Sequence, residues 1–266
     1  MGIGRNFQPY FSSEGFYLYL LDCLEFIDGL PANCIDLVFA DPPYNLSSGG
    51  FTCHAGRRVS VNKGKWDESK GIEEDYKFHL AWITACKRVL KPSGTIWISG
   101  TYHSIFSCGF ALQMAGYKIL NDIAWFKPNA APNLSGRCFT ASHETLIWAK
   151  KDPRAKHAFS YNEMKYGSWP EDPLKKQDKQ MRSVWSIPTT PAVEKRFGKR
   201  PTQKPLRLLD RIIRASSYEG DIVFDPFTGS STTGLAAYKL GRNFIGTDLE
   251  EGYLRLSKAR FENLRL

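Results

Sequence analysis

The chain has 266 residues, of which 42% are hydrophobic, 14% aromatic and 24% charged. This composition excludes a disordered, collagen-like or low-complexity protein, and the length allows one or two domains with a sizeable core. Lys and Arg number 36 against 27 Asp and Glu, and the resulting net charge of +9 suits a polyanionic partner such as nucleic acid.

The sequence shows no sign of secretion, membrane insertion or metal binding. The longest uncharged stretch, residues 92–117, contains Ser, Thr, Gly, His and Gln, so it is a poor membrane span. Near the N-terminus, Arg5, Asn6 and Gln8 interrupt any apolar signal core, and we expect a cytoplasmic protein with no membrane partner. The six cysteines form no CxxC motif and no Cys/His cluster at ligand spacing, so we expect reduced thiols and no metal.

In the first part of the chain, short apolar runs alternate with amphipathic segments. The runs predict strands at 16–21, 34–40, 95–99, 118–126 and 144–149, and the amphipathic segments predict helices at 23–28, 75–90 and 102–115. Residues 45–66 hold four glycines and the basic residues Arg57, Arg58, Lys63 and Lys65. That segment predicts a long, mobile, basic loop of the kind that often serves function.

The second part of the chain begins with a polar, basic segment, 150–199, rich in Pro, Trp and Tyr, which predicts a small loop-rich insertion. Order returns with a helix at 204–217, whose apolar face carries Leu206, Leu209, Ile212 and Ile213. Strands follow at 221–224 and 243–247, and helices at 229–240 and 250–264. Alternating strands and helices predict an open parallel sheet flanked by helices.

A first motif, Asp41-Pro42-Pro43-Tyr44, follows a buried strand. Ligands of open α/β sheets bind at the carboxyl ends of the strands. Asp41 can accept a hydrogen bond from an amino group, the two prolines offer carbonyl oxygens without competing amide hydrogens, and Tyr44 offers a flat face for stacking on a base. The same four residues could form a stiff turn with a solvated Asp, but their chemistry favours a binding site for a base that carries an amino group.

A second motif, residues 224–233 (FDPFTGSSTT), also follows a strand and opens a helix. Gly229 allows a tight turn, and the helix start presents free amide hydrogens to an anion. Asp248 ends the next strand, 19 positions later, which suits a carboxylate that grips ribose hydroxyls. Because the GxGxxG and GK[ST] patterns are absent, a nucleoside that carries a carboxylate, such as S-adenosylmethionine, fits better than NAD or ATP.

A third motif, residues 200–205 (RPTQKP), is on its own only a proline-bounded helix start. Together, however, the three motifs resemble the β group of DNA amino-methyltransferases, bacterial enzymes that methylate exocyclic amines of bases. The order of motifs agrees with that group over nearly the whole chain, and further similarity lies in Asp22-Cys23, in 88–92 and in 139–144.

The resemblance implies a Rossmann-like class I methyltransferase sheet, circularly permuted. Residues 1–149 and 200–266 would form the S-adenosylmethionine-dependent catalytic domain, and 150–199 a small target-recognition insertion. The catalytic residues that it implies are Asp41, Pro42, Pro43 and Tyr44. The cofactor-binding residues that it implies are Asp22, Cys23, Asp41, Thr202, Gln203, Lys204, Asp225, Pro226, Phe227, Gly229, Ser230, Ser231, Thr232 and Asp248.

The implied partner is double-stranded DNA, from which the target base must be flipped. Basic residues of the loop and the insertion are expected to contact phosphates, namely Arg57, Arg58, Lys63, Lys65, Lys175, Lys176, Lys179 and Arg182. The resemblance also implies a restriction endonuclease that acts on the same site without a stable complex. The sequence leaves open whether the enzyme is a monomer or a homodimer, and it shows no code for the recognised bases.

Several functions remain open at this point. Methylation of the cytosine N4 amine needs the same geometry, although Asp in the first motif place leans toward adenine N6 by family resemblance. Methylation of RNA or of a protein glutamine is another possibility, and the basic insertion favours nucleic acid. The non-enzymatic alternative is a DNA-binding module that has lost activity. The intact motifs at 41–44 and 224–233 argue against it.

Overall fold

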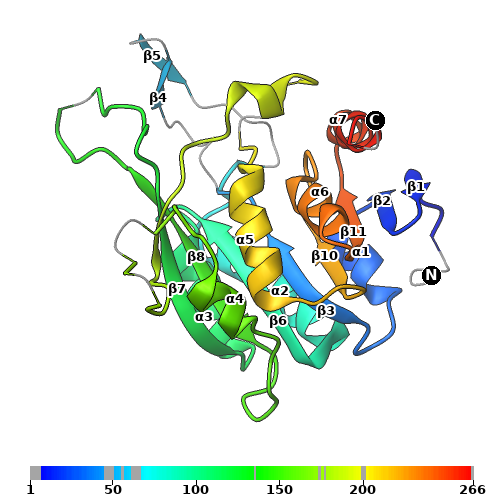
Figure 1. Ribbon diagram of the computed structural model, residues 1–266. Helices are drawn as coiled ribbons and strands as arrows, with labels where there is room; N and C mark the ends of the chain where they lie inside the picture. Colours follow the sequence, from blue (N-terminus) through cyan, green and yellow to red (C-terminus); the bar gives the residue numbers. More distant parts are fainter. Residues whose placement is uncertain are drawn as a thin grey trace.

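The computed structural model describes residues 7–44, 51–54, 57–60, 67–134, 136–172, 175–176, 178–198 and 202–264. These residues form one large sheet with helices on both faces, and a separate two-stranded sheet stands away from that body (Figure 1). Within the described residues, no helix is long and apolar enough to cross a membrane.

The large sheet has nine strands in the order β1-β2-β11-β10-β3-β6-β8-β7-β9. Strands from the two ends of the chain therefore lie next to each other at its centre. In chain order the strands are β1 (Phe11–Ser13), β2 (Phe16–Leu20), β3 (Ile35–Ala40), β6 (Leu90–Gly100), β7 (Lys118–Phe126), β8 (His143–Lys150), β9 (Val184–Ser186), β10 (Ile222–Asp225) and β11 (Asn243–Asp248).

The sheet is mixed, so the prediction of an open parallel sheet is wrong for β8, and β1, a strand that was not predicted, is antiparallel as well. β8 runs antiparallel to both of its neighbours, β6 and β7, and β1 runs antiparallel to β2. β7 and β8 follow each other in the chain, and the described residues between them form no helix. A loop suffices to join antiparallel neighbours, whereas parallel neighbours need a long crossover.

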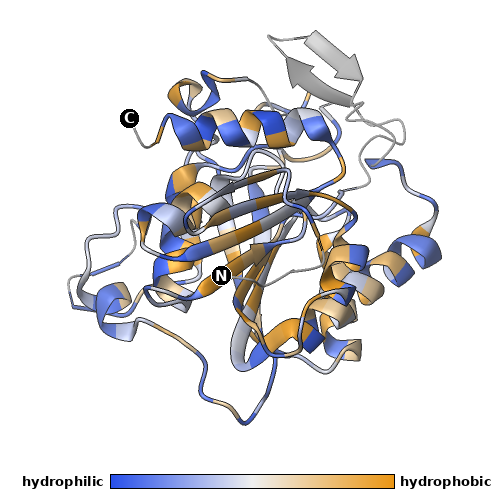
Figure 2. Cartoon of the chain, turned by 90° about the vertical axis from the view of Figure 1, so that its right-hand side faces the viewer, coloured by the Kyte–Doolittle hydropathy of each residue, from blue (hydrophilic) through white to orange (hydrophobic). Residues whose placement is uncertain are grey.

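Helices cover the two faces of the sheet in two separate groups. One face carries α1 (Cys23–Asp28), α2 (Ile72–Val89) and α3 (Ile105–Met114), and the other carries α5 (Leu206–Ser216), α6 (Thr232–Lys239) and α7 (Glu251–Glu262). Strand β6 shows how one strand serves both cores: Ile96 and Ile98 face the first group and Trp97 faces the second. Figure 2 shows the apolar residues concentrated in the central strands.

The insertion at 150–199 is largely irregular, as its composition predicts, but it contributes one strand to the sheet. It contains α4 (Tyr161–Tyr166), the short 3-10 helix η2 (Ala192–Lys195) and β9, which extends the sheet by pairing Trp185 with Trp125 of β7. The expected loop at 45–66 contains a hairpin, β4 (Phe51–His54) and β5 (Arg57–Ser60). The rest of that loop lies outside the described residues.

Candidate active site

Two of the predicted motifs meet where β3 and β10 lie side by side. β3 ends at Ala40 and leads into residues 41–44, and β10 ends at Asp225 and leads into the turn before α6. The two strands are parallel, with Val38 opposite Phe224. Because parallel neighbours end at the same edge of a sheet, the loops that follow them are brought together.

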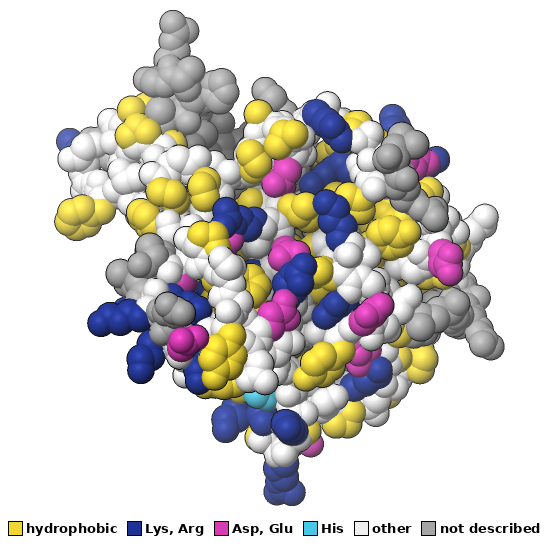
Figure 3. Space-filling view, viewed as in Figure 1, with side chains coloured by type: hydrophobic (Ala, Val, Ile, Leu, Met, Phe, Trp, Pro, Cys, Tyr) yellow, Lys and Arg dark blue, Asp and Glu magenta, His cyan; other side chains and the backbone are white. Residues whose placement is uncertain are grey.

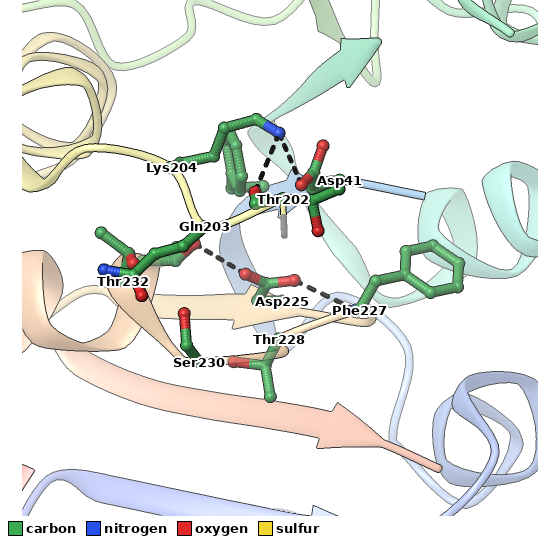
Figure 4. Close-up of a pocket in the computed structure, with 11 residues that line it drawn as sticks. Asp41, Thr202, Gln203, Lys204, Asp225, Phe227, Thr228, Ser230 and Thr232 are labelled. Carbon is green, nitrogen blue, oxygen red and sulfur yellow. Dashed lines mark hydrogen bonds and ion pairs between the residues drawn. The ribbon is translucent and has the colours of Figure 1, made fainter. Parts of the chain in front are cut away.

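Two hollows lie at this edge, and Asp41 and Phe227 line both of them. The first is narrow and is lined by Phe39, Asp41, Thr202, Gln203, Lys204, Asp225, Phe227, Thr228, Ser230, Thr232 and Thr233 (Figure 4). The second has a volume of about 280 Å³ and is lined by Leu21, Asp22, Cys23, Asp41, Pro43, Lys70, Phe78, Pro226, Phe227, Asp248, Leu249, Glu250 and Tyr253.

The turn before α6 has a left-handed backbone at two positions. Gly229 has φ 52° and Ser231 has φ 51°, a conformation that glycine adopts freely and other residues rarely. Neither value is helical, so α6 begins at Thr232 rather than at 229 as predicted. The amide of Gly229 donates to a carboxylate oxygen of Asp248 at 2.8 Å, which fixes the turn against the end of β11.

Buried polar groups hold the walls of the first hollow. Asp225 accepts hydrogen bonds from the amide of Phe227 at 3.0 Å and from the hydroxyl of Thr233 at 2.6 Å. Arg260 of α7 donates to the carbonyl of Ser230 at 2.5 Å, and burial lowers the pKa of its guanidinium to about 10. A cation and the amides of a helix start thus lie behind this loop, an arrangement that suits an anionic ligand group.

The second hollow combines aromatic walls with carboxylates. Phe78 and Phe227 lie 6.2 Å apart between ring centroids, and both line the hollow. Asp22 lines it while capping α1, where it accepts from the amide of Leu24 at 2.8 Å. Asp248, the last residue of β11, also lines this hollow. A slot with apolar walls and carboxylate acceptors fits the base and the ribose hydroxyls of a nucleoside.

A buried network of charges surrounds Asp41. The ammonium Nζ of Lys204 lies 2.7 Å from Asp41 Oδ2 and 2.7 Å from the Tyr44 hydroxyl, which itself donates to Asp41 Oδ1. Glu144 Oε2 lies 3.2 Å from that hydroxyl and 3.5 Å from Lys204 Nζ. Lys127 closes the network with a 2.5 Å contact to Glu144 Oε1. On the surface seen in Figure 3, basic and acidic side chains lie interspersed near the middle of the molecule.

The charges in this network stabilise one another against burial. Burial by itself would raise the pKa of Glu144, but the ammonium groups of Lys204 and Lys127 outweigh it and lower that pKa to about 2. Burial would lower the pKa of Lys204, but the carboxylates of Asp41 and Glu144 raise it. Both groups are therefore ionised at neutral pH. In this network, two basic side chains face two acidic ones.

Tyr44 is placed differently from the sequence-based expectation. Its side chain was expected to offer an open face for stacking, but the residue is only 4% exposed. Hydrogen bonds of its hydroxyl within the network hold the ring inward, and Lys204 Nζ lies 5.0 Å from the ring centroid. In this structure Tyr44 therefore serves as an anchor for Asp41 rather than as a stacking surface.

The structure brings together most of the residues that sequence reasoning assigned to a cofactor. All of them line one hollow or the other except Gly229 and Ser231, which shape the turn from behind. Lys204 lines the first hollow, but its ammonium group is engaged with Asp41 (Figure 4).

The basic residues assigned to DNA are spread over two segments. Arg57 and Arg58 begin β5, while Lys63 and Lys65 lie outside the described residues. In the insertion, Lys176, Lys179 and Arg182 are exposed, and Lys175 is half-buried with its ammonium group 3.3 Å from the carbonyl of Gly167. Of Lys175, Lys176, Lys179 and Arg182, whose side chains the structure describes, none lines either hollow.

Sequence reasoning gave no role to Glu144 and Lys127, which lie at the facing ends of β8 and β7. Both are only slightly exposed, and both belong to the network around Asp41. A signal was present, because Glu144 is an acidic residue at the start of an otherwise apolar run, 144–149. A charge at the end of a buried strand needs a partner or a function. Among the described residues, no group of three metal-ligating side chains is placed to hold an ion.

Comparison with known proteins decides the family. Residues 35–259 match the family model of the N6 and N4 methyltransferases, described as DNA methylase. The match covers both strand-end motifs, from Asp41 to Asp248, together with Glu144. The chain belongs to the DNA methylase family.

Curated relatives of this DNA methylase match it over nearly its whole length. The type II methyltransferase M2.DpnII of Streptococcus pneumoniae is 48% identical over 96% of this chain and 92% of its own length. M2.LlaDCHI of Lactococcus lactis subsp. cremoris is 46% identical over 95% and 91%, and M2.MboI of Moraxella bovis is 44% identical over 97% and 92%.

Solved structures share the fold of the DNA methylase. The complex of M1.HpyAVI with S-adenosylmethionine is 27% identical and superposes with a TM-score of 0.66 over 92% of this chain and 98% of the other. The PvuII DNA methyltransferase, named as cytosine-N4-specific, has a TM-score of 0.75 over 97% and 93% at 19% identity, which speaks for the fold alone. As a DNA methylase with this fold, the chain transfers methyl groups from S-adenosylmethionine to DNA.

Proposed function

We propose that this DNA methylase transfers a methyl group to the N6 amine of a flipped adenine at a specific site in double-stranded DNA, as the methyltransferase of a type II restriction–modification system. One observation carries the proposal. Asp41, the first residue of the Asp-Pro-Pro-Tyr motif, lines both hollows that would hold the cofactor, so the carboxylate that would bind the target amine stands beside the methyl donor.

The two hollows fit S-adenosylmethionine in two parts. The larger one, with Asp22 and Asp248 beside aromatic rings, would hold the adenosine, and the narrow one beside Ser230 and Thr232 would hold the methionine end. Arg260 and the start of α6 behind that loop suit the methionine carboxylate. When bound, the cofactor supplies an electrophilic methyl group on a sulfonium.

Residues 41 and 42 would prepare the nucleophile. The amino nitrogen of adenine is unreactive because its lone pair is delocalised into the ring. Asp41 and the carbonyl of Pro42 can accept hydrogen bonds from the two amino hydrogens, which draws the nitrogen toward tetrahedral geometry. Lys204 and Tyr44 hold the Asp41 carboxylate in place for this task. Alignment and fixed charges of this kind can contribute about 7–11 kcal/mol to a rate enhancement when the geometry is ideal.

The insertion at 150–199 would contact the DNA around the target. Lys176, Lys179 and Arg182 are exposed there, and β9 ties the segment to the sheet that carries the active site. A base inside a duplex is out of reach of Asp41, so the target has to be flipped at a cost of a few kcal/mol. Exposed cations on the insertion would hold the backbone while this occurs.

Adenine is the proposed target because Asp stands first in the motif, and the restriction–modification role is proposed because the whole-length relatives are type II methyltransferases. We further propose that the sheet order is a circular permutation of the class I methyltransferase sheet, that the enzyme acts in the bacterial cytoplasm, and that a restriction endonuclease reads the same site.

Single-molecule sequencing of DNA from a host that expresses the protein tests the target. We expect N6-methyladenine at one short recurring motif, absent from a host that expresses the Asp41→Asn variant. Mass analysis of the nucleosides distinguishes the outcomes. N4-methylcytosine would replace adenine by cytosine as the target, and methylation of RNA alone would overturn the proposal.

A further inference from the structure

The loop that joins β7 to β8 leaves the sheet at the same edge as the catalytic motif. β7 and β6 both run antiparallel to β8, so β7 runs parallel to β6 and β3, and its carboxyl end at Phe126 faces the same way as the end of β3 at Ala40. In Figure 1 this loop is the long green segment that rises from β7 and β8. Its two ends are joined to the active site, because Lys127 and Glu144 belong to the network around Asp41.

Phe139, on this loop, is 99% exposed, more than any other large hydrophobic side chain among the described residues. An exposed Phe forgoes about 1.5–3 kcal/mol of stabilisation that burial would give it. Single exposed apolar residues are ordinary on protein surfaces. Phe139 differs in its place, since it stands on an arm whose base is part of the catalytic network.

Hydrogen bonds brace the arm that presents Phe139. The side-chain amide of Asn133 donates to the carbonyl of Cys138 at 3.1 Å, and its backbone amide donates to the hydroxyl of Thr140 at 3.3 Å, so the residues on both sides of Phe139 are tied to one point. Lower on the arm, Asn129 exchanges two 3.0 Å hydrogen bonds with Thr189 of the insertion. An arm held at both levels keeps its apolar tip in water instead of folding it onto the protein.

We propose that Phe139 is a wedge that enters the base stack beside the target when the target base leaves the duplex. This inference rests on the proposed function. A flat, uncharged ring fills the gap left by a flipped base, and proteins that unstack DNA insert Phe, Leu, Ile or Met in this way. Arg137, exposed two positions away, suits the phosphates that flank such a gap. The net charge of +9 and the shared sheet edge favour DNA over a second copy of the chain as the occupant.

The test compares Phe139→Ala with Tyr218→Ala, a matched control. Tyr218 is another exposed aromatic residue, but it precedes β10 and so lies at the opposite edge of the sheet. Single-turnover methylation is measured on a matched duplex that contains the recognition motif and on the same duplex with a mismatch opposite the target base. We expect Phe139→Ala to slow methylation of the matched duplex by roughly tenfold or more, Phe139→Trp to restore it, and Tyr218→Ala to leave it unchanged.

The mismatched duplex separates a wedge from any other role. Its target is already unpaired, so we expect the loss caused by Phe139→Ala to shrink to about twofold or less there. With 2-aminopurine at the target position, the fluorescence increase on binding should fall for Phe139→Ala and persist for Tyr218→Ala. The wedge would be overturned if Phe139→Ala slowed methylation equally on both duplexes or slowed it on neither. It would also be overturned if the wild-type protein sedimented as a dimer and Phe139→Ala as a monomer, because a second copy of the chain would then be the occupant. Wild-type protein that methylates neither duplex would instead refute the proposed function.

Discussion

Asp41 is the residue on which both halves of the site depend, and its surroundings explain why an aspartate can act there. Its two carboxylate oxygens are held by Tyr44 and Lys204, so the side chain is oriented before any ligand arrives. Glu144 is a second acidic partner of Lys204, so the Lys204 ammonium group lies between two carboxylates rather than beside Asp41 alone. A carboxylate positioned in this way has little freedom to lose on binding a base.

Replacing Asp41 with Asn tests this role at nearly constant volume. The amide cannot accept hydrogen bonds at both positions and leaves Lys204 paired with Glu144 only. We expect kcat to fall by about a hundredfold or more, in line with the loss of a positioned electrostatic group, while the Kd for S-adenosylmethionine changes by less than about threefold. Methylation kinetics and calorimetry measure the two quantities. Near-normal turnover of Asp41→Asn would remove Asp41 from the chemistry.

Glu144 should make stability depend on acidity. Its pKa is lowered from 4.5 to about 2 in the folded protein, so its contribution is complete above pH about 4.5 and is lost as the pH falls through about 2. We expect Glu144→Gln to lower the free energy of unfolding by about 3 kcal/mol at pH 7, because Lys127 and Lys204 lose a partner. The gap from wild type should shrink between pH 5 and pH 3, since Gln does not titrate.

Urea unfolding at several pH values measures this gap. Glu251→Gln is the matched control, since Glu251 is an exposed glutamate at the start of α7 whose contacts are with Arg255 at 3.2 Å and with the Tyr10 hydroxyl at 3.4 Å. Such surface pairs contribute about 0–1 kcal/mol, so the control should stay close to wild type. A gap between Glu144→Gln and wild type that is the same at pH 3 and pH 7 would contradict the coupling of Glu144 to the two lysines.

At the scale of elements, the cofactor loop depends on how closely α6 approaches the sheet. Gly234 lies in the first turns of α6, where a Cβ atom would stand 2.4 Å from Phe244 Cε1 and 2.7 Å from Phe16 Cε2. Both rings are fully buried and pack on each other with centroids 5.1 Å apart, so neither can move aside freely. The glycine therefore allows the helix start, and with it Thr232, to reach the edge of the sheet.

Replacing Gly234 with Ala should push α6 off the sheet. We expect a loss of about 1–3 kcal/mol in the free energy of unfolding, typical of overpacking, together with weaker cofactor binding. Gly252→Ala is the control, because a Cβ atom there meets nothing within 4 Å on α7 and should stabilise that helix by up to about 1 kcal/mol. Urea midpoints compare the two variants. Equal midpoints for both would mean that α6 has room to spare.

Across the whole molecule, the sequence predicted what strand ends and chain order determine. Apolar runs that stop at Asp41 and Asp225 placed both motifs at one edge of a sheet, as the parallel pairing of β3 and β10 confirms. The direction of β8 could not be read, because it depends on which strands pair in space. The burial of Tyr44 could not be read either, since it depends on Lys204, 160 positions away in the chain. Glu144 gave a signal as an acidic residue beside an apolar run, but its pairing with Lys204 could not be read from the sequence.

The surplus of positive charge is also a property of the whole molecule, and it predicts how DNA binding responds to salt. Each phosphate contact releases counterions, so the logarithm of the binding constant should fall linearly with the logarithm of the salt concentration, by about 0.9 per contact. We expect the combined variant Lys176→Ala, Lys179→Ala and Arg182→Ala to reduce that slope by about two to three units. Lys239→Ala, an exposed lysine at the far end of α6, should leave it unchanged.

Fluorescence anisotropy with a labelled duplex at increasing salt measures these slopes. The comparison has weight because all four side chains are exposed, and removing any of them lowers the net charge by the same amount. A general effect of charge would therefore scale with the number of residues removed, wherever they lie. A variant that lacks three basic residues elsewhere on the surface serves as a further control. If its salt dependence fell by as much as that of the insertion variant, the insertion would have no specific role in contacting DNA. A loss confined to the insertion would map the path of the duplex across it.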